Sequence, residues 1–181
     1  MSLYQAVEAL TSQDNQKDMY QTFADYSAKL TRSDYAFFWH KSDDNDSKTI
    51  FTRGSINRDI EDKLVCYIKG IWNESSLIDE SIKISIENCN FYAATVQSAS
   101  RCYGLIGFRD DDCESVFIRK EYVNQLKFIS NLSAIILERL DLEEVTERLI
   151  VAEEQNRIAN EMHDSVAQRL FSISCAIHAI M

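Results

Sequence analysis

The sequence contains no proline and only four glycines among its 181 residues. These are the two residues that most often interrupt helices, so their scarcity allows very long helices. Basic residues are also few, because 19 Lys and Arg stand against 29 Asp and Glu, for a formal net charge of −10. An acidic chain lacks the clustered positive charge that neutralises nucleic-acid phosphates, so we expect no nucleic acid as a partner.

Long apolar runs are absent as well. No hydrophobic run approaches the roughly 20 residues that cross a bilayer. The N-terminus, from Met1 to Glu8, has neither the basic start nor the apolar centre of a signal peptide. Hydrophobic residues make up 45% and charged residues 27% of the chain, as is typical of globular domains. We therefore expect a cytoplasmic protein with no membrane span.

No two cysteines have the C-x₂-C spacing of a structural zinc site. The five cysteines are Cys66, Cys89, Cys102, Cys113 and Cys175. Stable disulfides are not expected in the cytosol. The first four lie in the N-terminal part of the chain, where four thiolates could ligate an iron–sulfur cluster. Two alternatives stay open: thiol redox sensing, and thiols that are simply buried or incidental.

Hydrophobic periodicity predicts both helices and strands in the first 140 residues. Helical spacing is found at residues 3–12, from the turn after Leu10 to about Leu30, from Asn57 to about Trp72, and from about Arg119 onward. Strands are predicted at Tyr35–His40, Lys48–Arg53, Phe91–Gln97 and Cys102–Phe108, and the segment 73–88 is ambiguous. This order predicts an α+β fold with one antiparallel sheet flanked by helices and followed by a long C-terminal helix. His40 ends a strand and is interpreted as a core or edge histidine rather than a haem ligand.

The C-terminal helix carries a heptad pattern of the kind that pairs helices. Its positions are Leu142, Val145, Leu149, Ala152, Asn156 and Ala159. A buried Asn156 would fix the register of such a pair at some cost in stability. If the heptad spacing continued unchanged, it would place His163 on the buried face of the helix. Ile158, Met162 and Val166 instead step by four, a stutter that rotates the apolar face and leaves His163 at its edge. The alternative to a stutter is that the irregular spacing simply reflects the wide apolar face of a helix in a four-helix bundle.

His163 and Asp164 are adjacent in this helix, and Gln168 follows one turn later. The surrounding stretch resembles the phosphoacceptor box of sensor histidine kinases of the NarX- and DesK-like subfamily, roughly E-R-x-R-I-A-R-E-L-H-D-x-x-x-Q. The matching positions are Glu154, Arg157, Ile158, Ala159, Glu161, His163, Asp164 and Gln168. The departures are Gln155 and Asn160, where a basic residue is usual, and Met162, where Leu is usual.

The resemblance implies a mechanism. Two chains pair as a homodimer through this helix, and a separate domain that binds ATP and Mg²⁺ delivers the γ-phosphoryl group to His163. A response regulator then accepts the phosphoryl group. By the same resemblance, Asp164 orients the ring and accepts its proton, and Gln168 positions a water for dephosphorylation. We expect the chain to lack the second bundle helix and the ATP-binding domain, and therefore to be inactive alone.

The predicted order of helices and strands resembles a GAF domain, a module that senses small molecules. The segment Tyr103-Gly-Leu-Ile-Gly-Phe-Arg109 is similar to a GAF strand that reads G-x-(L/I)-x-(L/V/F). A PAS domain is the competitor, although it lacks the pair of leading helices. We predict a GAF-like sensor domain at residues 1–140, followed at 141–181 by the signalling helix and first phosphoacceptor helix. The alternative function is a non-catalytic GAF module that binds a ligand or dimerises, or an iron–sulfur or thiol redox sensor that regulates a kinase.

Overall fold

The computed structural model describes residues 16–41, 50–74, 81–110 and 116–178. It contains two compact units, Met1–Glu138 and Arg139–Met181. The described elements follow in the order α2 (Gln16–Thr31), β1 (Ala36–His40), β2 (Ile50–Arg53), α3 (Arg58–Glu74), β3 (Ile82–Ile86), β4 (Cys89–Gln97), β5 (Cys102–Asp110) and α4 (Val116–His178). The first predicted helix, at residues 3–12, lies outside the described residues.

The strands form one five-stranded sheet in the order β2-β1-β5-β4-β3. Every neighbouring pair is antiparallel, and β1 lies between β2 and β5. The predicted α+β fold with an antiparallel sheet and a long C-terminal helix is therefore confirmed.

The first strand is apolar from Ala36 to Trp39 because both faces of the sheet are covered. On one face, Tyr35, Phe37 and Trp39 are buried in a core cluster that includes Leu64 and Ile68 of α3. On the other face, the ring of Phe38 lies 5.0 Å from Tyr20 and 5.4 Å from Phe23, both on α2.

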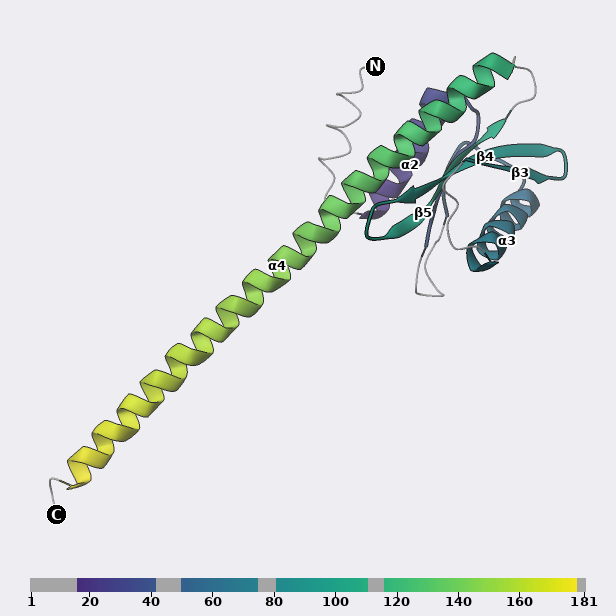
Figure 1. Ribbon diagram of the computed structural model, residues 1–181. Coiled ribbons are helices and arrows are strands. Elements are labelled where there is room, and N and C mark those ends of the chain that lie inside the picture. Colours follow the sequence, from purple (N-terminus) through teal and green to yellow (C-terminus); the bar gives the residue numbers. More distant parts are fainter. Residues whose placement is uncertain (1–15, 42–49, 75–80, 111–115, 179–181) are drawn as a thin grey trace. The chain divides into compact units, whose positions relative to one another are not determined.

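The N-terminal part of α4 packs on the same face as α2 (Figure 1). Leu126 and Ile129 are buried there. The Ser130 hydroxyl donates a hydrogen bond to the Thr95 carbonyl of β4. The ring of Tyr122 makes an edge contact with Phe108 of β5, with centroids 6.4 Å apart. These contacts join the beginning of α4 directly to two inner strands of the sheet.

The sequence pattern missed one strand. The segment that the pattern left ambiguous contains β3, in which Ile84 and Ile86 are buried while Lys83 and Ser85 are exposed. Such a short alternation acquires a structure only through its partner, and β3 pairs with β4 from Ile82↔Ala93 to Ile86↔Cys89. None of the helices among the described residues is long and apolar enough to cross a membrane.

The glycines of the segment Tyr103–Arg109 have a steric role. Gly104 has φ +157°, and a Cβ there would lie 2.0 Å from the Trp39 carbonyl oxygen. A Cβ at Gly107 would lie 2.4 Å from Cζ of Phe37 and 2.7 Å from the Tyr92 carbonyl oxygen. Both residues allow β5 to approach its neighbours closely, so this glycine pattern is explained by packing.

Candidate functional site

The candidate site lies on α4 in the second unit. Two ion pairs on the helix surface come just before it in the sequence. The Arg157 guanidinium lies 2.5 Å from the Glu154 carboxylate and 2.6 Å from that of Glu161. Pairs three and four residues apart support a helix, because their side chains meet on its surface. Arg157 accordingly lowers the pKa of Glu154. These three residues, which belong to the predicted phosphoacceptor box, hold the helix regular on the N-terminal side of His163.

The structure brings His163 and Asp164 together. Nδ1 of His163 lies 3.8 Å from Oδ1 of Asp164, and the two side chains are 84% and 80% exposed. The distance is longer than a hydrogen bond but within the range of electrostatic attraction. The carboxylate lies on the Nδ1 side of the ring, which leaves Nε2 as the nitrogen available to a reacting group. An exposed imidazole with one nitrogen beside a carboxylate can act as a nucleophile through the other.

Gln168 lies on the face of Asp164 rather than on that of His163. Residues four apart share a helix face, whereas five residues correspond to about 140° of rotation at about 100° per residue. The Gln168 side chain is exposed, and its main-chain carbonyl accepts a hydrogen bond of 2.9 Å from Ser172. Gln168 also borders a shallow hollow with Ser165, Arg169, Ser172 and Ile173. Sequence reasoning did not single out these four neighbours, although their helical spacing from Gln168 was visible.

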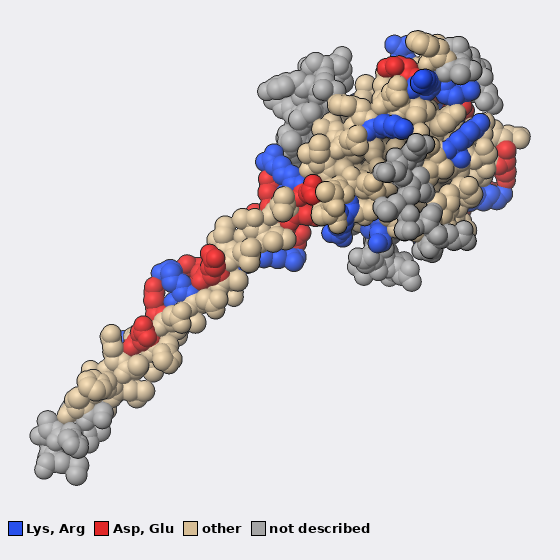
Figure 2. All heavy atoms as spheres, in the orientation of Figure 1, with Lys and Arg blue, Asp and Glu red and all other residues tan. Residues whose placement is uncertain are grey.

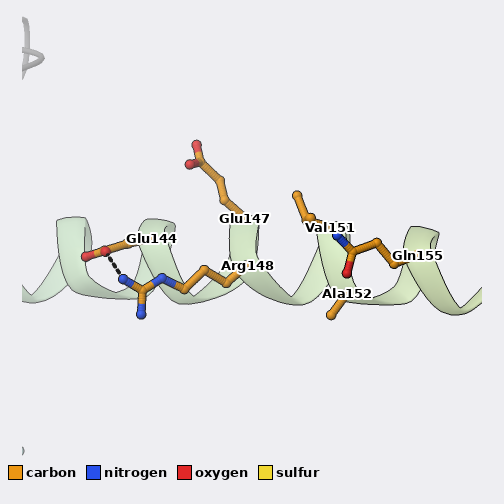
Figure 3. Close-up of a pocket in the computed structure, with 6 residues that line it drawn as sticks. All are labelled: Glu144, Glu147, Arg148, Val151, Ala152 and Gln155. Atoms are coloured by element: carbon orange, nitrogen blue, oxygen red, sulfur yellow. Dashed lines mark hydrogen bonds and ion pairs between the residues drawn. The ribbon is translucent and has the colours of Figure 1, made fainter.

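A second hollow lies upstream on the same helix (Figure 3). It is lined by Glu144, Glu147, Arg148, Val151, Ala152 and Gln155, and the Glu144–Arg148 ion pair of 2.5 Å closes one end. Glu144, Glu147, Arg148 and Val151 are spaced i, i+3, i+4 and i+7. That spacing outlines the hole that receives a side-chain knob from a neighbouring helix. The hollow is therefore suited to helix packing rather than to a small ligand.

Large apolar side chains are exposed along the second unit. The exposed fraction is 62% for Leu142, 59% for Leu149, 64% for Met162 and 62% for Leu170. Figure 2 shows one face of this unit, on which charged groups give way to uncharged ones toward the C-terminal end. A helix that exposes this much apolar surface has a binding partner as its ordinary explanation.

A comparison with protein-family models found one match in this part of the chain. Residues 154–181 match the histidine kinase family. The matched stretch includes the whole predicted box, with His163, Asp164 and Gln168. It supports the assignment of this segment to the dimerisation and phosphoacceptor portion of a sensor histidine kinase. Histidine kinase domains of this type dimerise and signal to response regulators in two-component signal transduction.

The other comparisons add no functional assignment. No curated protein matches the chain. Among solved structures, the chain is similar to the ligand-binding domain of the Pseudomonas aeruginosa PAO1 amino acid chemoreceptor PctC in complex with GABA, at 10% identity and a TM-score of 0.35. The similarity covers 65% of this chain and 55% of the chemoreceptor chain. A TM-score this low indicates neither a shared fold nor a shared function.

The four cysteines considered for a cluster do not fit one shared site. Cys66 is exposed on α3, and Cys113 lies outside the described residues. Cys89 begins β4, whereas Cys102 pairs with Gln97 at the other end of that strand. A nine-residue strand separates them by about 26 Å at about 3.3 Å per residue. A cluster binds its cysteine ligands around one small centre, so Cys89 and Cys102 cannot both ligate it.

Two further observations agree with this geometry. The described residues contain no group of three or more His, Cys, Asp or Glu that could hold a metal ion. Burial raises the pKa of the Cys102 thiol, which disfavours the reactive thiolate. His40 stacks on the ring of Tyr20 at 4.6 Å, in keeping with a packed histidine.

Proposed function

We propose that the chain is the sensory and dimerisation/phosphoacceptor portion of a cytoplasmic two-component sensor histidine kinase, with His163 as the phosphoacceptor. The observation that carries the proposal is the exposed His163–Asp164 pair inside the stretch that matches the histidine kinase family. Exposure is required, because a separate domain must reach the ring with ATP and a response regulator must reach it afterwards.

The position of Asp164 indicates which nitrogen reacts. A carboxylate on the Nδ1 side favours the tautomer with the proton on Nδ1, so the lone pair is on Nε2. Nε2 would attack the γ-phosphorus of ATP, the bond to the bridging oxygen of ADP would break, and ADP would leave. Asp164 would stabilise the positive charge that develops on the ring and accept the Nδ1 proton. ATP and Mg²⁺ would be held by the separate kinase domain.

Phosphotransfer and dephosphorylation complete the proposed cycle. An aspartate of the response regulator would take the phosphoryl group from Nε2. Gln168, on the face of Asp164, would position a water against the regulator's phospho-aspartate. The hollow beside Gln168 is bordered by Arg169, a cation suited to an acidic partner surface near the phosphoryl group.

For the first unit we propose a GAF-like sensor of a small molecule. A five-stranded antiparallel sheet with α3 on one face and α2 and α4 on the other supports this interpretation. A ligand bound to this unit could influence the kinase through α4, which joins both units in sequence and is hydrogen-bonded to β4 through Ser130.

The test is phosphorylation in trans. The chain is incubated with ATP, Mg²⁺ and the isolated kinase domain of a histidine kinase of this type, and acid-labile phosphohistidine is measured. We expect phosphorylation of the unmodified chain, none in His163→Gln, and the unmodified level in the control His40→Gln. His40 is a suitable control because it lies in the sheet, against Tyr20.

A chain that binds the kinase domain but is never phosphorylated would favour the alternative. That alternative is a non-catalytic GAF module that uses α4 only to dimerise. Visible absorption and iron analysis after anaerobic purification would separately test a redox cofactor, and the separation of Cys89 and Cys102 predicts a colourless, iron-free protein.

A further inference from the structure

Within the first unit, polar contacts join α4 to the β4–β5 hairpin at both ends of the packed part of the helix. At one end, Nε of Arg119 lies 2.9 Å from Oδ2 of Asp110, the last residue of β5. At the other end, the Ser100 hydroxyl donates a hydrogen bond of 3.0 Å to the Glu138 carboxylate. Glu138 is the last residue of the first unit. The helix therefore follows the hairpin from the end of β5 back to the β4–β5 turn.

The β4–β5 turn positions the Ser100 hydroxyl for this contact. The Ser98 hydroxyl oxygen accepts the backbone N–H groups of Ser100 and Arg101, both at 3.2 Å. Oγ of Ser98 also lies 3.1 Å from Oγ of Ser100. Because the Ser100 hydroxyl has one proton and donates it to Glu138, Ser98 is the donor in this pair. The hydrogen bonds thus form a chain from Ser98 through Ser100 to Glu138, in which each bond polarises the next.

The two attachments differ in how well they exclude water. The Asp110 and Arg119 side chains are 7% and 26% exposed, and Leu126 is fully buried further along the same part of α4. At the hairpin turn, Ser100 is exposed and Glu138 is half-buried. Hydrogen bonds that water can reach belong to the parts of a protein that open most readily. The attachment at Glu138 is therefore the weaker of the two.

Close to the weaker attachment, α4 buries a hydroxyl group that lacks a partner. Ser133 is fully buried, and its Oγ makes no hydrogen bond with any part of the chain that the structure describes. Ser130, three residues earlier, donates instead to the Thr95 carbonyl. A buried hydroxyl without a partner disfavours the packed position, and water would satisfy it if this part of the helix left the sheet. Ser133 thus opposes the packing that Ser100 and Glu138 support.

We propose that the Ser100–Glu138 contact is a latch, which holds residues 132–138 of α4 against the sheet when it is closed and releases them when it opens. Burial of Ile136 and Leu137 keeps the closed position the major one. The hydrogen bond of the latch and the unpaired hydroxyl nearby act in opposite directions on this equilibrium. A modest change in the sheet is therefore sufficient to shift the population of the open position.

The hairpin connects the latch with the other face of the sheet. Phe91 and Ala93 of β4 and Leu105 of β5 belong to the core cluster beneath α3. The two strands are paired with each other, so a shift of either one displaces the turn that joins them. A change in the core cluster would reach the latch by this route. The inference deepens the proposed sensor function, on which the signalling role of the latch rests.

The rate at which a buried thiol reacts with a maleimide measures how often the latch opens. A single cysteine is introduced as Ala134→Cys, on the buried side of α4, in a full chain whose five native cysteines are replaced by alanine. Ala24→Cys, buried on α2, is the control for unfolding of the whole unit. Circular dichroism confirms that each chain is folded before the maleimide is added.

The two serines should change this rate in opposite directions. Ser100→Ala removes the hydrogen bond to Glu138 and should speed labelling about two- to tenfold. Ser133→Ala removes the unpaired hydroxyl and should slow labelling about fivefold or more. Ser85→Ala, whose exposed hydroxyl is bonded to Asn90, should leave the rate unchanged.

Three results would overturn the latch. The first is an unchanged labelling rate in Ser100→Ala. The second is an equal rise at the Ala24→Cys control, which would mean that the whole unit unfolds. The third is that Ser133→Ala slows labelling no more than Asn131→Ala, an exposed substitution on the same helix with a similar gain in helix propensity.

A second measurement keeps the native cysteines and tests the signalling role. In the phosphorylation assay in trans, Ser100→Ala and Ser133→Ala should shift the rate of phosphorylation of His163 in opposite directions, with Ser85→Ala as the control. Equal rates in both variants and the unmodified chain would overturn the signalling role. If the unmodified chain is never phosphorylated, the proposed function fails, whereas the labelling rates still decide whether the latch exists.

Discussion

The buried phenol of Tyr35 allows a direct test of how the core of the first unit is stabilised. Tyr35 precedes β1 and is fully buried in the cluster between the sheet and α3. Its hydroxyl has no hydrogen-bond partner among the described residues. Burial raises the pKa of Tyr35, and the nearby Glu61 carboxylate raises it further. Glu61 is close enough to act through its charge, but the hydroxyl makes no hydrogen bond of normal geometry with it.

Tyr35→Phe removes this unpaired hydroxyl and keeps the ring. A buried hydroxyl without a partner costs roughly 1–3 kcal/mol, so the variant should be more stable than the unmodified chain by about 1 kcal/mol at neutral pH. Tyr92→Phe is the control, because Tyr92 is only half-buried and stacks on Phe108. The control should change the free energy of unfolding by less than about 0.5 kcal/mol.

The pKa of Tyr35 also predicts a dependence on pH. Because the folded-state pKa is raised, the phenol stays protonated in the native state while the unfolded chain loses the proton above about pH 10. The stabilisation of the folded state that comes from this pKa difference is fully present below about pH 10, and it is lost as the pH rises further. The loss is at most about 1.4 kcal/mol per pH unit, and less where water screens the group. Tyr35→Phe should lack this part of the alkaline decline.

Urea unfolding between about pH 7 and pH 11 measures both effects. Trp39 and Trp72, whose rings lie 5.1 Å apart beside this core, supply the fluorescence signal. If Tyr35→Phe is destabilised at neutral pH, the hydroxyl has a partner, and Glu61 is the candidate. If both chains decline equally above about pH 10, Tyr35 does not hold its proton in the folded state.

Two further predictions concern the proposed phosphoacceptor and the sheet. Asp164→Asn should lower phosphorylation of His163 in trans by about 10²–10⁴-fold, because a general base contributes roughly that factor, while dimerisation measured by sedimentation stays unchanged. An unchanged rate would remove Asp164 from the mechanism. Gly107→Ala should destabilise the chain by about 2–3 kcal/mol, because its Cβ would meet Phe37 and the Tyr92 carbonyl. Gly70→Ala has open space around its Cβ on α3, so it should stabilise by about 0.5–1 kcal/mol, and equal effects of the two substitutions in thermal unfolding would refute this reasoning.

The local sequence pattern was sufficient to predict those helices and strands whose formation depends mainly on their own residues. The helices α2, α3 and α4 were predicted from apolar spacing, and their observed bounds differ by a few residues. The four strands that were predicted are present because each carries a run of apolar or β-branched residues that suits a covered sheet. β3 was missed because three isoleucines in five residues do not distinguish a strand from a helix until β4 pairs with them.

The candidate functional residues also fall into two groups, those that the local sequence identifies and those whose relation depends on the tertiary structure. The sequence identified His163, Asp164 and Gln168, since neighbours in a helix are close whatever the rest of the chain does. It could not show which cysteines converge, because that depends on strand register, and the register places Cys89 and Cys102 at opposite ends of β4. It also could not show that Phe128 and Ile135 stay exposed, because a helix that packs on a sheet offers apolar residues to the sheet as well.

The sequence alone determined the long helix and the place of the His163–Asp164 pair on it, because helical periodicity and an adjacent pair of residues are properties of a few consecutive positions. The tertiary structure decided which apolar side chains the sheet covers and which remain outside. Leu126 and Ile129 are buried against the strands, whereas Phe128 and Ile135 are exposed on the other side of the same helix. Burial depends on what lies across from a residue, and that neighbour comes from a distant part of the chain.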